Sequence, residues 1–235
     1  MHFPSQHRLP NILVVDNYAP NHPDYERIAK TTGYLFRKKI QKRIRSLCHL
    51  LFFGEVHILF QKAECLPKTE LLQYLFSPKW DLIIVTGSPF NAHDEHEWIT
   101  NQIFAYQKVL EGVIYAPLLG ICFGHQLIAL SGGGKIGSTQ QYYHGDTSLL
   151  LMNGESLPIF RSHRYYVSHI PETAHILATS EDVIENKKLP YALSYSTTNK
   201  SCIITLQPHP EHPPHSKNKE LISLLRRWLC VRTIS

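Results

Sequence analysis

The sequence predicts an α/β protein with three layers, in which a largely parallel β-sheet lies between helices on both faces. Short apolar runs rich in β-branched residues alternate along the chain with longer segments of helical periodicity. Several of these runs end in turn-forming residues, as buried parallel strands do. Hydrophobic residues make up 43% of the chain and charged residues 18%, a balance that is typical of globular proteins and excludes a disordered chain.

A strand and a long helix begin the predicted fold. The strand covers Asn11–Val15, where an apolar run is followed by the polar residues Asp16 and Asn17. Residues 23–52 predict a largely helical segment. Its apolar positions recur at helical spacing with basic residues between them, and they are Ile40, Ile44, Leu47 and Leu51. This pattern is that of an amphipathic helix.

Three further strands alternate with two helices in the middle of the chain. We predict strands at Val56–Phe60, Asp81–Val85 and Val113–Leu119, and helices at Lys68–Phe76 and Trp98–Leu110. The run at Asp81–Val85 is the strongest strand signal of the sequence. Strands that alternate with helices in this way favour a parallel sheet.

Shorter β signals fill the last third of the chain. They lie between residues 141 and 206, for example at Ser148–Met152, and they end in the apolar strand Cys202–Leu206. Lys217–Leu229 predicts a terminal amphipathic helix. Because the sequence contains no repeat, low-complexity tract or long linker, we expect residues 1–235 to form a single domain.

Charge and cysteine content narrow the class of protein. The formal net charge is +5, and the basic residues gather in Arg37–Lys39 and Lys42–Arg45. A solvated helical face explains them better than an acidic partner or nucleic acid, so nucleic acid is not expected as a partner. No segment reaches the roughly 18 apolar residues of a membrane span, and residues 1–8 lack the apolar core of a signal peptide. Five scattered cysteines favour reduced thiols and a cytoplasmic location.

Cys122 is the candidate nucleophile of the sequence. It lies in Gly120–Gln126, where a buried strand runs into a predicted helix. A sharp turn at this point lifts the side chain above the sheet, and the flanking glycines permit strained backbone torsions. The helix N-terminus adds partial positive charge, which favours the reactive thiolate. The alternative interpretation is a buried structural cysteine between turn glycines.

Two other segments supply what a cysteine nucleophile needs. His209 follows the last strong strand and is the candidate base, with Glu211 as the carboxylate that orients it. Backbone N–H groups that stabilise a tetrahedral oxyanion can come from Phe123 and from Gly87 or Ser88. Each segment alone is an ordinary turn, but the three together predict a catalytic site.

These segments resemble the class I, triad-type glutamine amidotransferase family, and in particular its stand-alone branch similar to the GMP synthetase amidotransferase domain and the γ-glutamyl peptidases. The resemblance covers about residues 81–212 and is most specific at Gly120–Gln126 and His209–Glu211. It implies a flavodoxin-like fold with the active site at the carboxyl ends of the strands. It also implies that Cys122 is the nucleophile, that His209 acts as base and then as acid, and that no metal or organic cofactor is required.

The same resemblance implies a set of substrate contacts. Gln126 matches the family position that contacts glutamine, and Ser162 and His163 match a segment that lines the glutamine pocket. Relatives commonly continue with Gly or Gln and then Asp, whereas this chain has Arg164 and Tyr165. Arg164 either binds a substrate carboxylate or points to water. The expected partners are glutamine or a small γ-glutamyl compound, with a separate synthase or a protein substrate as alternatives.

Other motifs do not support a metal or phosphate site. In Gly132–Lys135 the next residue, Ile136, stands where a phosphate loop needs Ser or Thr. His93–Glu97 lacks a second ligand cluster of suitable spacing, and so does the set His209, His212 and His215, so no metal is expected. Two other classes stay open. One is a non-catalytic interaction module that acts through the basic helix near residue 40, and the other is a cysteine peptidase or chaperone of related fold.

Overall fold

Nine β-strands form one continuous mixed sheet in the computed structural model, which describes residues 8–18, 33–184 and 187–230. The strands are β1 (Asn11–Asp16), β2 (His57–Lys62), β3 (Leu82–Val85), β4 (Leu118–Ile121), β5 (Lys135–Leu151), β6 (Ser156–His169), β7 (Ala174–Ile184), β8 (Lys187–Tyr195) and β9 (Ile203–Leu206). The helices are α2 (Gly33–Leu51), α3 (Lys68–Phe76), α4 (Glu97–Leu110), α5 (Phe123–Ser131) and α6 (Lys219–Trp228), with short 3-10 helices η1 (Ala63–Cys65) and η2 (His215–Lys217).

The strand order divides the sheet into a parallel and an antiparallel part. The order is β2-β1-β3-β4-β9-β8-β7-β5-β6. Strands β2, β1, β3, β4 and β9 pair in parallel, whereas the pairs from β9 through β8, β7 and β5 to β6 are antiparallel. The parallel part carries the predicted alternation of strand and helix, and its carboxyl edge is where ligand sites of such sheets form.

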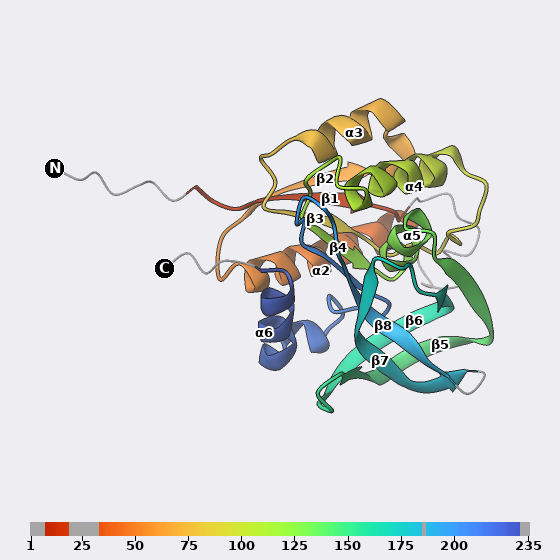
Figure 1. Cartoon of the computed structure of the whole chain (residues 1–235). Helices are drawn as coiled ribbons and strands as arrows, with labels where there is room; N and C mark the ends of the chain where they lie inside the picture. Colours follow the sequence, from red (N-terminus) through yellow and green to blue (C-terminus); the bar gives the residue numbers. More distant parts are fainter. Residues whose placement is uncertain (1–7, 19–32, 185–186, 231–235) are drawn as a thin grey trace.

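Helices cover both faces of the parallel part. Figure 1 shows α3 and α4 on one side of these strands and α2 and α6 on the other. In β3, Leu82 and Ile84 pack in the cluster shared with α2 and α6, whereas Ile83 and Val85 pack in the cluster shared with α3, α4 and α5. Because successive strand residues point to opposite faces, a strand buried on both faces must be apolar throughout.

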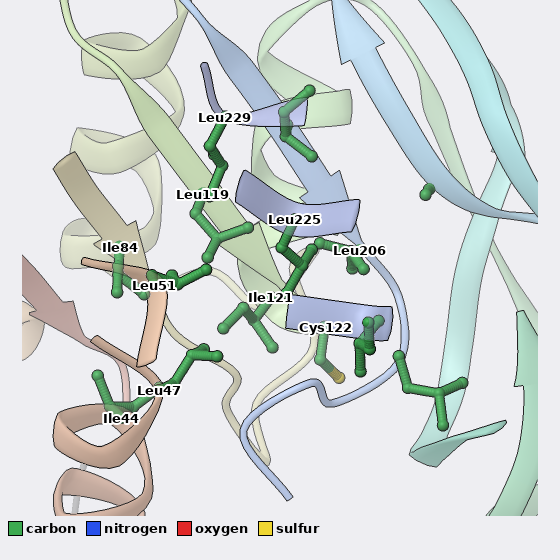
Figure 2. Packing of buried hydrophobic residues seen from close by; sticks show 14 of the residues in the cluster. Ile44, Leu47, Leu51, Ile84, Leu119, Ile121, Cys122, Leu206, Leu225 and Leu229 are labelled. Atoms are coloured by element: carbon green, nitrogen blue, oxygen red, sulfur yellow. The ribbon is translucent and has the colours of Figure 1, made fainter. Parts of the chain in front are cut away.

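The amphipathic stripe of α2 forms a large share of one core layer. Its four predicted apolar residues are all buried. Figure 2 shows Ile44, Leu47 and Leu51 packed towards residues of β3 and β4, with Cys122 at one end of the group. Each fully buried aliphatic side chain of this kind stabilises the fold by roughly 1.5–3 kcal/mol. The predicted helical residues 23–32 lie outside the described residues.

The strand predicted at Val113–Leu119 forms only at its end. Strand β4 begins at Leu118, and the side chains of Val113 and Tyr115 are exposed. The backbone N–H groups of Val113 and Ile114 both donate to the carbonyl of Lys108, at 3.0 and 3.2 Å. The last turn of a helix has carbonyls without a partner inside the helix, and these two N–H groups pair with one of them. The same N–H groups are therefore not available for pairing with a neighbouring strand.

The antiparallel strands are longer than the short β signals of the sequence. Strand β5 has 17 residues and β6 has 14, but most side chains of β5 are exposed or half-buried. A strand that contacts the core only locally carries an apolar signal only there, so its remaining length is not visible in the sequence. In the described part of the chain, no helix has the length and apolarity to cross a membrane.

Candidate active site

Cys122 lies in a strained turn between β4 and α5. Its φ is 53° and its ψ is −101°, a conformation that costs of order 1–3 kcal/mol for a residue with a side chain. The turn is held from both sides, because the Cys122 N–H donates to the Leu206 carbonyl at 2.7 Å and the Cys122 carbonyl accepts from the Gln126 N–H at 3.1 Å. Strain that is fixed in this way indicates a side chain placed for chemistry.

Gly124 explains why a glycine follows the nucleophile at this distance. A Cβ at position 124 would lie 2.3 Å from the carbonyl oxygen of Val85 in the neighbouring strand β3. Glycine therefore lets the first turn of α5 pack directly on the sheet. This close packing brings the end of β4 and the end of β3 together at one edge.

His209 and Glu211 meet Cys122 from the end of β9. The Nδ1 atom of His209 lies 2.8 Å from Oε1 of Glu211, and both side chains are buried. The His209 N–H donates to the Phe160 carbonyl at 2.7 Å, which fixes this segment against β6. The second ring nitrogen, Nε2, is buried and forms no hydrogen bond with a described residue.

Charge stabilises the protonated form of the His209 ring. Burial lowers its pKa, but the Glu211 carboxylate and then Cys122 outweigh burial and raise the pKa well above the ordinary value of 6.5. For Glu211, burial alone would raise the pKa, but the nearby His209 outweighs burial, and the pKa is lowered. Both directions describe one buried ion pair in which the imidazolium is close to the Cys122 sulfur.

Gly87, at the end of β3, completes the meeting of the three predicted segments. A Cβ built on Gly87 would lie 3.2 Å from Cε1 of His209 and 3.5 Å from Cβ of Cys122. The backbone N–H groups of Gly87, Ser88 and Phe123 donate to no backbone carbonyl among the residues that the structure describes. The Ser88 hydroxyl donates to the carbonyl of Asn17 at 2.8 Å, which fixes this turn to the end of β1.

Two amides, Gln207 after β9 and Gln126 in α5, support the Cys122 sulfur. Gln207 Nε2 lies 3.7 Å from the Cys122 sulfur, within range for donation, and Gln126 Nε2 donates to Oε1 of Gln207 at 3.2 Å. Gln126 also donates to the backbone carbonyl of Tyr165 at 3.0 Å. The Gln126 side chain therefore reaches the Cys122 sulfur only through Gln207, a residue of the segment Gln207–Glu211 to which the sequence assigned no role.

Of the predicted substrate contacts on β6, only Ser162 lines the pocket beside Cys122. The carbonyl of Ser162 lies 3.8 Å from the Cys122 sulfur. His163 is buried beneath the strand with its Nε2 atom 3.4 Å from the Tyr191 hydroxyl, and burial lowers its pKa to about 3. The side chains of Arg164, which is exposed, and Tyr165 do not line the pocket. The roles of these residues and of Gln126 stay predictions.

The pocket has a volume of about 390 Å³ and is bounded on one side by helix α2. The side chains of Phe36, Lys39, Ile40 and Arg43 line it. Their spacing places all four on one face of the helix. The sequence shows the basic residues of this helix, but only the fold brings two of them to the side of Cys122.

Aromatic rings form the opposite wall of the pocket. His212 stacks on Phe160 with ring centroids 3.7 Å apart and an interplanar angle of 11°, and His144 meets Phe160 edge-on at 5.0 Å. The hydroxyls of Tyr142 and Ser162 lie 2.7 Å apart across the β5–β6 pair. The residues of β5 and β6 come together through antiparallel pairing, for which the sequence gives no local signal, and His212 joins them from the segment after β9.

The comparison with protein families gives one match. Residues 55–226 match the family model described as glutamine amidotransferase class-I. This range includes all the residues predicted for the catalytic site. Among the described residues, no group of three His, Cys, Asp or Glu side chains has the geometry of a metal site.

Curated relatives share about a third of the aligned residues. The glutamine-hydrolyzing GMP synthase of Clostridium kluyveri is 32% identical over 144 residues, which cover 57% of this chain and 26% of that protein. Gamma-glutamyl peptidase 3 of Arabidopsis thaliana is 32% identical over 122 residues, which cover 44% of this chain and 47% of that protein. The chain thus spans only a quarter to a half of the length of these relatives.

Solved structures share the fold at low sequence identity. A structure described as that of a GMP synthase protein from Thermoplasma acidophilum has a TM-score of 0.62 at 18% identity, covering 95% of this chain and 96% of that one. A glutamine amidotransferase from Thermotoga maritima has a TM-score of 0.61 at 17% identity, covering 95% and 99%. The mixed sheet with helices on both faces is therefore the fold of these proteins.

Proposed function

The chain belongs to the class-I glutamine amidotransferase family, and from this premise we propose that it is a hydrolase that cleaves the γ-amide of glutamine or of a γ-glutamyl compound. The observation that carries the proposal is the meeting of Cys122, His209 and Glu211 at the edge of one pocket. A cysteine, a base and an orienting carboxylate are the groups that acyl transfer from an amide needs.

The proposed reaction has two steps. The Cys122 thiolate attacks the γ-carbonyl carbon, and a tetrahedral intermediate forms. Its C–N bond then breaks as His209 gives its proton to the departing amine, which leaves a γ-glutamyl thioester on Cys122. His209, now neutral, takes a proton from water as the water attacks the thioester, and the acid is released with the thiolate restored.

The surroundings of the sulfur support this order of events. The raised pKa of His209 keeps a proton on the ring at neutral pH, ready for the departing amine. The sulfur lies at the N-terminus of α5, where partial positive charge favours an anion. The N–H groups of Gly87 or Ser88 and of Phe123 are proposed to hold the oxyanion, and one such donor contributes about 3–4 kcal/mol to the transition state.

Two relatives suggest two versions of the same activity. The peptidase relative supports a hydrolase that acts alone on γ-glutamyl compounds, which is the version we favour. The GMP synthase relative supports a glutaminase that passes ammonia to a separate synthase. The two versions differ in one measurement, because only the second predicts ammonia release from glutamine that rises sharply when a synthase partner is added.

The decisive test is turnover by the purified protein. It is incubated with glutamine and a panel of γ-glutamyl peptides, and glutamate and ammonia are measured beside the Cys122→Ala variant. We expect the wild type to release glutamate and the variant to be inactive. A γ-glutamyl electrophile should label Cys122 in the wild type. If the wild type is as inert as the variant and the electrophile fails to label, the protein is a non-catalytic module of this fold.

A further inference from the structure

A buried ion pair fixes helix α2 against the candidate active site. Arg37 donates through Nε to Asp16 at 3.0 Å and through Nη1 to Glu64 at 2.9 Å. Asp16 is the last residue of β1, so the pair attaches α2 to the carboxyl edge of the sheet. Gln41 adds a further hydrogen bond to Asp16 at 2.8 Å. The bonds of Arg37 and Gln41 therefore hold the face of α2 that lines the pocket in place.

Two cations on this face line the pocket and form no ion pair with a described residue. Neither Lys39 nor Arg43 forms an ion pair with any Asp or Glu that the structure describes, and no acidic side chain lines the pocket. Phe36 and Ile40 between them reduce the access of water, which strengthens the field of the two charges. This arrangement predicts an anionic ligand.

His212, which also lines the pocket, does not add to its positive charge. Burial, and then the nearby Arg43, lower its pKa to about 4, so the ring is neutral at pH 7. It stacks on Phe160 as an uncharged aromatic ring. The fixed positive charge of the pocket outside the His209–Glu211 pair therefore belongs to Lys39 and Arg43.

The position of Arg43 indicates which end of a substrate it meets. Arg43 lines the same pocket as His209 and His212. Gln207 and Gln126 do not line it, so Arg43 lies on the side of the site where His209 is oriented. In the proposed reaction His209 protonates the departing nitrogen. The amine half of the substrate therefore extends from His209 towards Arg43, away from the support formed by Gln207 and Gln126.

We propose that Lys39 and Arg43 bind a carboxylate on the amine half of the substrate. The preferred substrates are then γ-glutamyl amino acids or peptides rather than glutamine, whose amine half is ammonia. This inference rests on the proposed function. The pocket volume of about 390 Å³ agrees with it, since cavities of this size hold ligands with several substituents.

Two ligands of nearly equal shape test the charge requirement. γ-Glutamylglycine ends in a carboxylate, and γ-glutamylglycinamide replaces it with a neutral amide. Binding of each to the inactive Cys122→Ala protein is measured by calorimetry, and turnover of each is measured with wild type. We expect the carboxylate compound to bind at least about tenfold more tightly, because charge-assisted hydrogen bonds to Arg are stronger than neutral ones.

Matched variants assign the preference to the two cations. Lys39→Gln and Arg43→Gln, each in the Cys122→Ala background, should bring the two affinities to within about twofold by weakening only the carboxylate compound. Arg43→Lys should keep part of the preference. Lys42→Gln removes an exposed cation of the same helix that does not line the pocket, and it should leave both affinities unchanged.

The outcomes separate this inference from the proposed function. If both compounds are hydrolysed equally well, the activity stands and the carboxylate site is wrong. Equal weakening of both compounds by Arg43→Gln would place the cation at the glutamyl end, which also overturns the inference. If γ-glutamylglycine binds with the predicted preference but is not hydrolysed by wild type, the carboxylate site stands and the proposed hydrolysis fails. If neither compound binds, the inference is wrong.

Discussion

At the scale of single residues, the protonated state of His209 depends on Glu211. The two side chains are 2.8 Å apart in a buried site, where a lone imidazolium would be costly. The Glu211 carboxylate is the main group that raises the pKa of His209 against the effect of burial. Removing its charge should therefore change both the rate and the pH dependence of the proposed reaction.

Glu211→Gln tests this dependence. We expect kcat/KM to fall by about 10²-fold or more, because the ring loses the group that orients it and holds its proton. Activity is lost at alkaline pH as His209 loses its proton, and without the carboxylate this loss moves to lower pH. Profiles of kcat/KM against pH for both proteins measure the shift. Glu220→Gln, at an exposed position, is the control, and an unshifted alkaline limb would show that Glu211 does not hold the proton.

The sequence predicts the residues around the sulfur better than those that surround a substrate. Cys122, His209 and Gly87 follow strands of the parallel part, whose carboxyl ends must meet at one edge, and the structure brings them together. The contacts expected at His163 and Tyr165 depend on which face of β6 each side chain occupies. Because alternate residues point to opposite faces, the lining Ser162 is followed by a buried His163.

At the scale of elements, the packing of α5 on β3 depends on Gly124. Its missing side chain leaves room for the Val85 carbonyl, and no rotamer change can move a backbone atom of a central strand. Gly124→Ala should destabilise the protein by roughly 1–3 kcal/mol through overpacking, although alanine favours a helix. Denaturant unfolding measures the change. Gly54→Ala is the matched control, since nothing lies within 4 Å of a Cβ at that position. Equal stability of the two variants would contradict the close contact.

Arg37 makes a second prediction at this scale. Arg37→Met removes the cation that neutralises Asp16, and burial already raises the pKa of that carboxyl. Leaving one partner of a buried pair without the other typically costs about 3–5 kcal/mol, so unfolding should occur at clearly lower denaturant concentration. Adding Asp16→Asn should recover part of the loss. Lys42→Met, at an exposed position of the same helix, is the control and should leave the unfolding midpoint unchanged. An unchanged midpoint for Arg37→Met as well would show that the ion pair does not stabilise the fold.

Elements whose apolar residues follow a continuous or regularly spaced pattern were visible in the sequence, and those with an interrupted pattern were not. Helix α3 has the predicted bounds, and β1 and β3 differ from prediction by one residue at one end. The apolar runs of β1 and β3 are continuous because side chains pack on both faces of the sheet, whereas α3 buries a single stripe with Leu71 and Leu75. The pattern of β5 is interrupted, because most of this long strand contacts the core with few side chains. Its pairing with β6, which builds the aromatic wall, requires long-range contacts that no local pattern records.

At the scale of the whole molecule, the site lies where the two parts of the sheet meet. Strand β9 pairs in parallel with β4, which leads to Cys122, and antiparallel with β8, which leads into the other part. The parallel part supplies the reacting groups, and β5 and β6 supply a wall of the pocket. Two uncharged histidines lie in the core of this junction. His125 in α5 lies with Nδ1 2.8 Å from the Thr205 hydroxyl of β9, and His163 lies in β6.

Acid should therefore destabilise the folded protein before its carboxylates are protonated. Burial lowers the pKa of both His125 and His163 to about 3, from an ordinary value of 6.5. Below pH 6.5 the unfolded chain binds protons that the folded protein excludes. The stability of the fold therefore decreases as the pH is lowered from 6.5 towards 3. His209 has the opposite sign, because its raised pKa stabilises the folded state increasingly as pH falls towards 6.5 and by a constant amount below that, so it offsets only the first part of the loss.

Between pH 7 and pH 5 we expect a net loss of at least roughly 3 kcal/mol, from about 1 kcal/mol per pH unit for each of the two buried rings minus the contribution of His209, with a smaller added loss from the half-buried His212, whose pKa is about 4. Denaturant unfolding at a series of pH values gives the slope of stability against pH. His163→Gln should reduce that slope by about one proton, even if it lowers stability at pH 7. His175→Gln removes an exposed ring and should leave the slope unchanged. Stability that stayed constant down to pH 5 would mean that His125 and His163 accept protons in the folded state, and that the core at this junction is open to water.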